Sequence, residues 1–147
     1  MNLDTKIPPP IVTIIILSII YFFSLKDYNI NNELISIFLL VLGILFILSA
    51  VIQFVKRKTT VNPTKPHKTT SLVISGTFKI TRNPMYLGML LIIMSYSFYK
   101  SSIISLVLIP LFIFYINKFQ IEPEEYEMRK KFGKEYEEYC KKVDRWI

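Results

Sequence analysis

The sequence contains few of the residues from which common cofactor and metal sites are built. It has only four glycines, spaced too widely to form a GxGxxG turn or a P-loop. Its single cysteine, Cys140, excludes an internal disulfide framework and any zinc site made of several cysteines. Its single histidine, His67, excludes a histidine-rich metal site and leaves only one possible histidine base. We therefore expect no metal site, no Rossmann-type nucleotide site and no serine-hydrolase chemistry.

The sequence is, in contrast, rich in apolar residues. The 147 residues have the size of one domain, 52% of them are hydrophobic, and the mean hydropathy is +0.40. A soluble domain this small would expose much of that apolar surface, whereas a bilayer is a solvent for it. The net charge is +7, and the basic residues flank the apolar segments. We expect anionic lipid headgroups, and not nucleic acid, to be their partner.

Four apolar segments predict the architecture. They cover residues 7–25, 34–55, 84–99 and 103–119. Backbone groups in lipid must be hydrogen-bonded within the segment, so each segment is expected to be a helix. The prediction is an all-α polytopic membrane protein, with residues 1–147 forming one domain and about four transmembrane helices. Residues 84–99 are short for a span, and could be tilted, interfacial or half of a helical hairpin with the fourth segment.

The distribution of basic residues predicts the orientation. Seven lysines and arginines fall within residues 56–83, and seven more fall within the tail, residues 122–147. The positive-inside rule places both regions in the cytoplasm, at the inner membrane of the cell. With four spans, both termini are then cytoplasmic.

Two patterns predict how helices pack. Small residues recur every seven positions in the second segment, as Ser36, Gly43 and Ala50. Such a stripe indicates close packing against another helix of the same chain, with a dimer contact as the alternative. In the tail, one helical face is apolar. Its residues are Met128, Phe132, Tyr136, Tyr139 and Val143. This face indicates one amphipathic helix, or two helices hinged at Gly133, that packs against the bundle or lies on the membrane surface.

Two polar clusters at the ends of apolar segments are candidate sites. Asn83 before Pro84 is typical of a helix start, with Asn83 as the N-cap. That positive helix end, reinforced by Arg82, could also receive a carboxylate or phosphate, with Tyr86 one turn inside. Glu124 and Glu125 begin a second helix, and could simply complement its dipole. Neighbouring helical residues diverge by about 100°, so these two carboxylates cannot share one role.

The ordered motifs resemble the isoprenylcysteine carboxyl methyltransferase family and the related phospholipid methyltransferases. They are Leu-Val-x-Ser-Gly at 72–76, Arg-Asn-Pro-Met-Tyr-Leu-Gly at 82–88, Glu-Glu-x-x-Met-x-x-x-Phe-Gly-x-Glu-Tyr-x-x-Tyr at 124–139, and Val-x-Arg-Trp at 143–146. The resemblance implies S-adenosyl-L-methionine as methyl donor at the cytoplasmic face, and a lipophilic acceptor. The implied donor contacts are Thr70, Ser71, Leu72, Val73, Phe78, Asn83, Pro84, Met85, Tyr86 and Glu124. Arg82, Tyr86 and Glu124 are expected to position the reactants.

The sequence departs from the family pattern at three positions. Asn83 stands where many members have His, and Phe78 stands where many have Tyr. Gln120 stands where the eukaryotic enzymes have a substrate-contacting Arg, and a neutral amide is a weaker partner for a carboxylate than a guanidinium. The acceptor is therefore left open between a prenylcysteine carboxylate, a phospholipid amine and another lipophilic group.

Two other classes of protein stay open at this point. Membrane enone and sterol reductases have a similar Arg-x-Pro-x-Tyr-x-Gly segment and use NADPH, but they typically place an acid after that glycine, where this chain has Met89. A non-catalytic, lipid-binding relative is the other alternative. The sequence also predicts that Glu125, turned away from the donor, pairs with a basic residue of the loop, with Arg82 the first candidate. The sequence does not predict the oligomeric state of the protein.

Overall fold

The computed structural model describes residues 7–24, 33–57 and 71–147. These residues form helices, turns and short irregular segments, and no strand occurs among them. The elements are α1 (Pro9–Phe23), α2 (Glu33–Lys56), the short 3₁₀ turn η2 (Gly76–Lys79), α3 (Pro84–Tyr99), α4 (Ser105–Ile116), the π turn η3 (Asn117–Ile121), α5 (Glu122–Phe132) and α6 (Lys134–Lys142). The all-α class predicted from the sequence is confirmed, and α3 has the predicted bounds.

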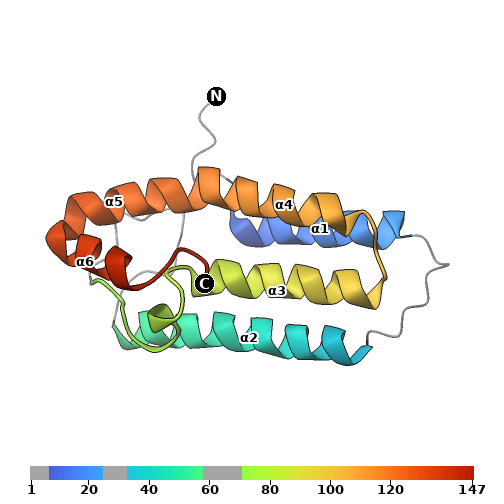
Figure 1. Cartoon of the computed structure of the whole chain (residues 1–147), viewed down its shortest axis with the longest axis horizontal. Coiled ribbons are helices and arrows are strands. Elements are labelled where there is room, and N and C mark those ends of the chain that lie inside the picture. Colours follow the sequence, from blue (N-terminus) through green and yellow to red (C-terminus); the bar gives the residue numbers. More distant parts are fainter. Residues whose placement is uncertain (1–6, 25–32, 58–70) are drawn as a thin grey trace.

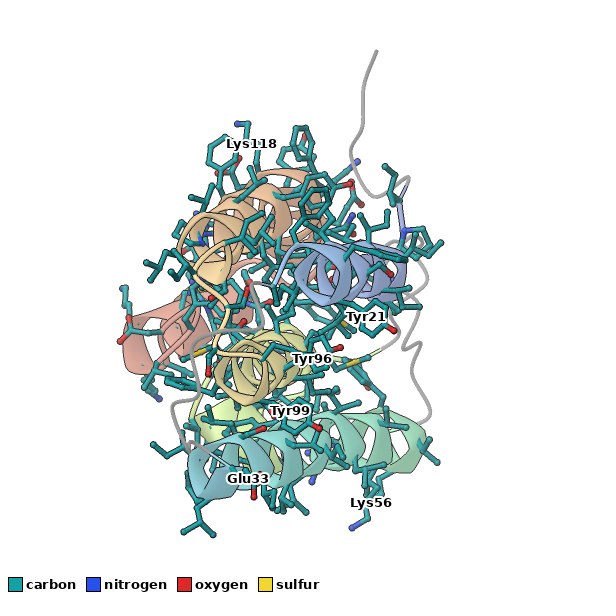
Figure 2. The ribbon with its side chains drawn as sticks, turned by 90° about the vertical axis from the view of Figure 1, so that its right-hand side faces the viewer. Tyr21, Glu33, Lys56, Tyr96, Tyr99 and Lys118 are labelled. Carbon is teal, nitrogen blue, oxygen red and sulfur yellow. The ribbon has the colours of Figure 1, made fainter. Side chains whose placement is uncertain are left out.

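The helices form an antiparallel bundle around α3 (Figure 1). Helix α2 lies along one side of α3, and α1 and α4 lie along the other (Figure 2). Because α3 is the central helix, it is buried on several sides, including at Leu87, Leu90 and Ile93. The apolar core on the α1 and α4 side is completed by Ile20 and Phe112.

The small-residue stripe of α2 packs against α3. Ser36, Gly43 and Ala50 are the buried residues of α2. The Ser95 hydroxyl donates to the Ser36 carbonyl at 2.7 Å. A Cβ atom added at Gly88 would lie 2.6 Å from the Gly43 carbonyl oxygen, so the two backbones touch. The predicted internal packing is confirmed.

The fourth apolar segment and the tail are not separated as the sequence suggested. Helices α4 and α5 are joined through η3 into one continuous helix, Ser105–Phe132, of 28 residues. Pro123 has no N–H to donate, and its ring would clash with the carbonyl four residues earlier in a regular α-helix. The wider π turn ends just before this proline, which lets the helix continue past it.

Among the residues that the structure describes, two helices are long and apolar enough to cross a membrane, Glu33–Lys56 and Ser105–Phe132. Helices α1 and α3, with 15 and 16 residues, are shorter than the roughly 20 residues that span a bilayer upright. The outer faces are nevertheless apolar, with Phe22 77%, Phe38 65% and Leu106 75% exposed. Lipid would cover such faces, so the structure is compatible with a membrane bundle, while the count of four spans stays a prediction.

At one end of the bundle, Lys100 lies near three tyrosines, which Figure 2 labels. The Lys100 ammonium lies 5.2 Å, 5.9 Å and 5.8 Å from the ring centroids of Tyr21, Tyr96 and Tyr99. Aromatic rings and lysines are the residues that favour a membrane–water interface. This end is opposite the polar corner described below (Figure 1).

The tail folds back on the bundle. Gly133 adopts φ +49°, a conformation that favours glycine, and it separates α5 from α6. Tyr136 and Tyr139 are buried in a cluster with Ala50, Val73 and Phe78. The predicted hinge is confirmed, and of the two placements predicted for the apolar face the structure shows packing against the bundle.

Candidate functional site

The corner before α3 is held by hydrogen bonds to the C-terminal segment. Helix α3 begins at Pro84 with Asn83 as its N-cap residue, as predicted, but the Asn83 side chain makes no capping hydrogen bond. The Asn83 side-chain amide donates to the Arg145 carbonyl at 2.8 Å instead, and the Asn83 N–H donates to the Thr81 hydroxyl at 3.1 Å. The hydrogen bond to the Arg145 carbonyl orients the Asn83 side chain, which explains why it does not cap the helix. The first turn of α3 is thus left without a side-chain cap from Asn83.

Tyr86 and Glu124 form a pair between α3 and α5. The Tyr86 hydroxyl donates a hydrogen bond to Glu124 Oε1. Tyr86 is 6% exposed, and its position one turn inside α3 brings it under α5. The structure thus brings together two residues, far apart in sequence, that the resemblance assigns to the methyl donor.

Gln120 lies on the same helical face as Glu124, one turn earlier. Its side chain is fully buried, and its Nε2 donates to the Ile7 carbonyl at 3.0 Å. Among the residues that the structure describes, its Oε1 has no hydrogen-bond partner. Gln120 is therefore buried one turn before Glu124, and its role toward a substrate stays a prediction.

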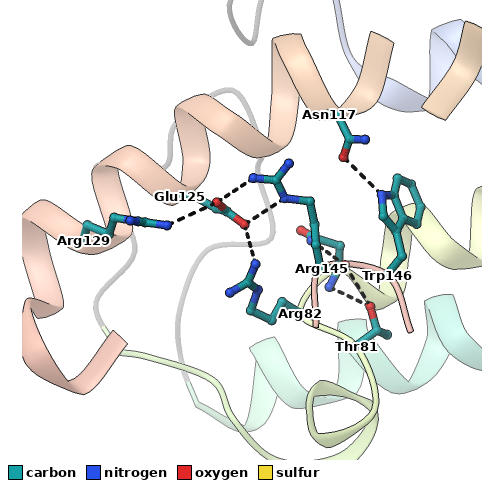
Figure 3. Close-up of polar contacts among 8 residues, drawn as sticks. Thr81, Arg82, Asn117, Glu125, Arg129, Arg145 and Trp146 are labelled. Carbon is teal, nitrogen blue, oxygen red and sulfur yellow. Dashed lines mark hydrogen bonds and ion pairs between the residues drawn. The ribbon is translucent and has the colours of Figure 1, made fainter. Parts of the chain in front are cut away.

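Glu125 is the centre of a buried ionic network (Figure 3). Its Oε1 accepts from Arg82 Nη2 at 3.0 Å and from Arg145 Nε at 3.1 Å, and its Oε2 accepts from Arg145 Nη2 at 2.9 Å. Arg129 adds a weaker ion pair at 3.8 Å. The Glu125 side chain is only 8% exposed. The hydrogen bonds to Glu125 raise the pKa of the Arg145 guanidinium. The pairing of Glu125 with Arg82 is the one expected from the sequence.

The segment before the corner packs against α2. Ser75 donates to Gln53 Oε1 at 2.8 Å, and Gly76 adopts φ +62° directly against the Gln53 side chain. Val73 and Phe78 are buried in the cluster that holds Tyr139, whose hydroxyl donates to the Phe78 carbonyl at 2.6 Å. Burial raises the pKa of Tyr139, which keeps that hydroxyl protonated as a donor.

The predicted donor contacts divide into three groups. Asn83, Pro84, Tyr86 and Glu124 gather where α3 begins and α5 passes it. Leu72, Val73, Phe78 and Met85 lie in or against the adjacent apolar cluster. Ser71 donates to the Arg57 carbonyl at 3.3 Å, and Thr70 lies outside the described residues.

The sequence did not assign roles to several residues that complete this region. Arg145 and Trp146 belong to a quoted motif, but their partners, Glu125 and Asn117, lie 20 and 29 positions away. The Trp146 indole N–H donates to Asn117 Oδ1 at 3.1 Å, and its ring packs against the core. Periodicity carries no signal for such long-range side-chain pairs.

Residues 32–135 match the model of the phospholipid methyltransferase family, and the chain belongs to that family. An uncharacterized protein of Haemophilus influenzae (strain ATCC 51907 / DSM 11121 / KW20 / Rd) is 40% identical over 63 residues, which are 43% of this chain and all of that protein. No solved structure matches the chain. The resemblance noted in the sequence is confirmed at the level of the family.

Proposed function

We propose that the protein is an S-adenosyl-L-methionine-dependent methyltransferase that acts on a lipophilic acceptor at the cytoplasmic membrane face. The observation that carries the proposal is the Tyr86–Glu124 pair. It joins two residues, 38 positions apart in sequence, that both lie within the stretch matched by the family model. Buried acid–hydroxyl pairs near the end of a membrane bundle are typical of a polar functional site.

The residues present fit the proposed donor, which carries a carboxylate, an amino group and a sulfonium. The first turn of α3, without a side-chain cap from Asn83, offers amide N–H groups and a positive dipole to a carboxylate. Arg82 Nε is buried and has no hydrogen-bond partner among the described residues. Glu124 supplies a carboxylate for a cationic group. When bound, S-adenosylmethionine would supply an already activated methyl group.

The chain's own residues would therefore bind and orient the reactants in a site from which water is excluded. The polar groups of the reactants would be positioned by Arg82, Tyr86 and Glu124. The apolar cluster that contains Val73, Phe78 and Met85 would line the site and exclude water. A carboxylate or thiolate acceptor needs no base, whereas an amine must first lose a proton. Gln120 beside Glu124 is neutral, so a carboxylate acceptor would find no guanidinium at that position.

A matched titration tests the donor. Isothermal calorimetry on the detergent-solubilised full chain should show saturable binding of S-adenosylmethionine and none of NADPH. Binding of NADPH alone would support a reductase, and binding of neither would support a non-catalytic relative. Met89, which follows Gly88 where reductases typically place an acid, is 7% exposed and packs in the apolar core, which favours the methyltransferase.

We further propose four spans in the inner membrane with both termini in the cytoplasm. The polar corner and the basic tail lie together at one end of the bundle, which this orientation places in the cytoplasm. Lys100 and the tyrosines near it lie at the opposite end, where they would face the other membrane surface. Reporter enzymes fused after residues 29 and 147 should report an extracytoplasmic and a cytoplasmic position, respectively. Export of the reporter after residue 147 would refute the orientation.

A further inference from the structure

The C-terminal strap, residues Val143–Trp146, contacts both elements that carry the Tyr86–Glu124 pair. The chain leaves α6 at Val143 in an extended conformation and returns to the bundle. On one side, the strap's carbonyls bind the corner before α3. The Asp144 carbonyl accepts from the Arg82 N–H at 2.9 Å, and the Arg145 carbonyl accepts from the Thr81 hydroxyl at 3.1 Å.

On the other side, the strap's side chains bind the long helix that contains Glu124. Arg145 makes a bidentate contact to Glu125, the residue next to Glu124, at 3.1 Å and 2.9 Å. Trp146 donates to Asn117 in the π turn at 3.1 Å. The strap therefore ties the start of α3 to the helix from Asn117 to Glu125, as Figure 3 shows.

The distance between these two elements sets the distance between Tyr86 and Glu124. Tyr86 is on α3 and Glu124 is on α5, and the strap is hydrogen-bonded both to the corner before α3 and to the helix that contains Glu124. A planar guanidinium that binds both oxygens of a carboxylate fixes orientation as well as separation. Misplacement of reacting groups by about 1 Å can cost about a hundredfold in rate.

We propose that the strap is a positioning element of the methyl-donor site, in which Arg145 and Trp146 hold α3 and α5 at the separation that donor binding requires. This inference rests on the proposed function and adds to it residues outside the stretch that the family model matches. Arg145 acts through Glu125 and the corner, and it is a positioning residue and not a donor contact. Its loss should weaken donor affinity in protein that is still folded.

The test uses the single tryptophan of the chain as the reporter of strap docking. In the full chain, Arg145→Gln should move Trp146 emission to longer wavelength and weaken S-adenosylmethionine affinity by about tenfold or more. Arg145→Lys should give an intermediate affinity, because it keeps the charge and loses the bidentate contact. The matched control is Lys142→Gln, an exposed residue at the end of α6, which should leave both readouts unchanged.

Asn117→Ala is the second variant, because it keeps the ion pairs of Glu125 and removes only the acceptor of the Trp146 indole N–H. It should shift the emission and weaken donor affinity by several-fold, even if Arg145→Gln does not fold. Unchanged donor affinity in folded Asn117→Ala and Arg145→Lys would overturn the inference, whatever their melting temperatures. The absence of donor binding by the unmodified protein would instead overturn the proposed function, and the donor role of the strap with it.

Discussion

Replacing Glu125 with glutamine should lower the free energy of unfolding by about 3–5 kcal/mol, the usual cost of removing one partner from a buried ion pair. The Glu125 side chain is 8% exposed, and two guanidinium groups, from Arg82 and Arg145, depend on it. A neutral amide leaves both cations without a counter-charge in a partly desolvated region. Thermal unfolding in detergent, followed by circular dichroism, measures the loss.

The same helix provides a matched control for this prediction. Glu122 pairs with Lys118 at 3.0 Å, the distance of the Arg82–Glu125 pair, but its side chain and that of Lys118 are 46% and 58% exposed. Glu122→Gln should therefore change stability by no more than about 0.5 kcal/mol. Equal effects of the two substitutions would show that burial does not set the strength of the Glu125 network.

Replacing Glu124 with glutamine should abolish binding of S-adenosylmethionine while the protein stays folded. Glu124 accepts from the Tyr86 hydroxyl and has no guanidinium partner among the described residues, so it is available to a cationic ligand, which would favour its charged form. Charge-assisted hydrogen bonds are about twice as strong as neutral ones, and the amide cannot replace them. Calorimetry measures the affinity, and the melting temperature reports the fold.

Tyr86→Phe separates the two partners of this pair. It keeps the buried ring and removes only the hydroxyl, so it should weaken donor affinity less than Glu124→Gln does. The Glu122→Gln variant again serves as the control with unchanged affinity. If Glu125→Gln lost donor affinity at unchanged melting temperature while Glu124→Gln kept it, the roles of the two acids would be exchanged.

The apolar patterns predicted most of the fold. A helix in lipid must satisfy its own backbone, so the apolar segments could only be helices, and the small-residue stripe identified the face of α2 that meets α3. The apolar face of the tail and the hinge at Gly133 also followed from residue spacing. The bounds of α3 were given by Pro84 and by the polar residues that begin at Lys100.

The polar region was predicted less completely, for physical reasons. The roughly 100° between helical neighbours separated Glu124 from Glu125, and the loop charge suggested Arg82 as a partner. Local rules failed where a distant group competed, as at Asn83, whose amide prefers the Arg145 carbonyl to a helix cap. The strap was not predicted, because one side of it binds through carbonyl groups that every residue possesses, and the other binds side chains 20 and 29 positions away.

The contact between Gly43 and Gly88 limits how this sequence can vary. A Cβ atom at either position would meet the other backbone at 2.7 Å or 2.6 Å, and Gly88 follows Tyr86 by two residues. A larger residue there would push α3 off α2 and carry Tyr86 with it. The outward face of α2, with Leu34, Phe38 and Leu45 more than half exposed, carries no such restriction. Over evolutionary time, that face is free to exchange one apolar residue for another, whereas the glycine pair constrains the position of Tyr86 at the start of α3.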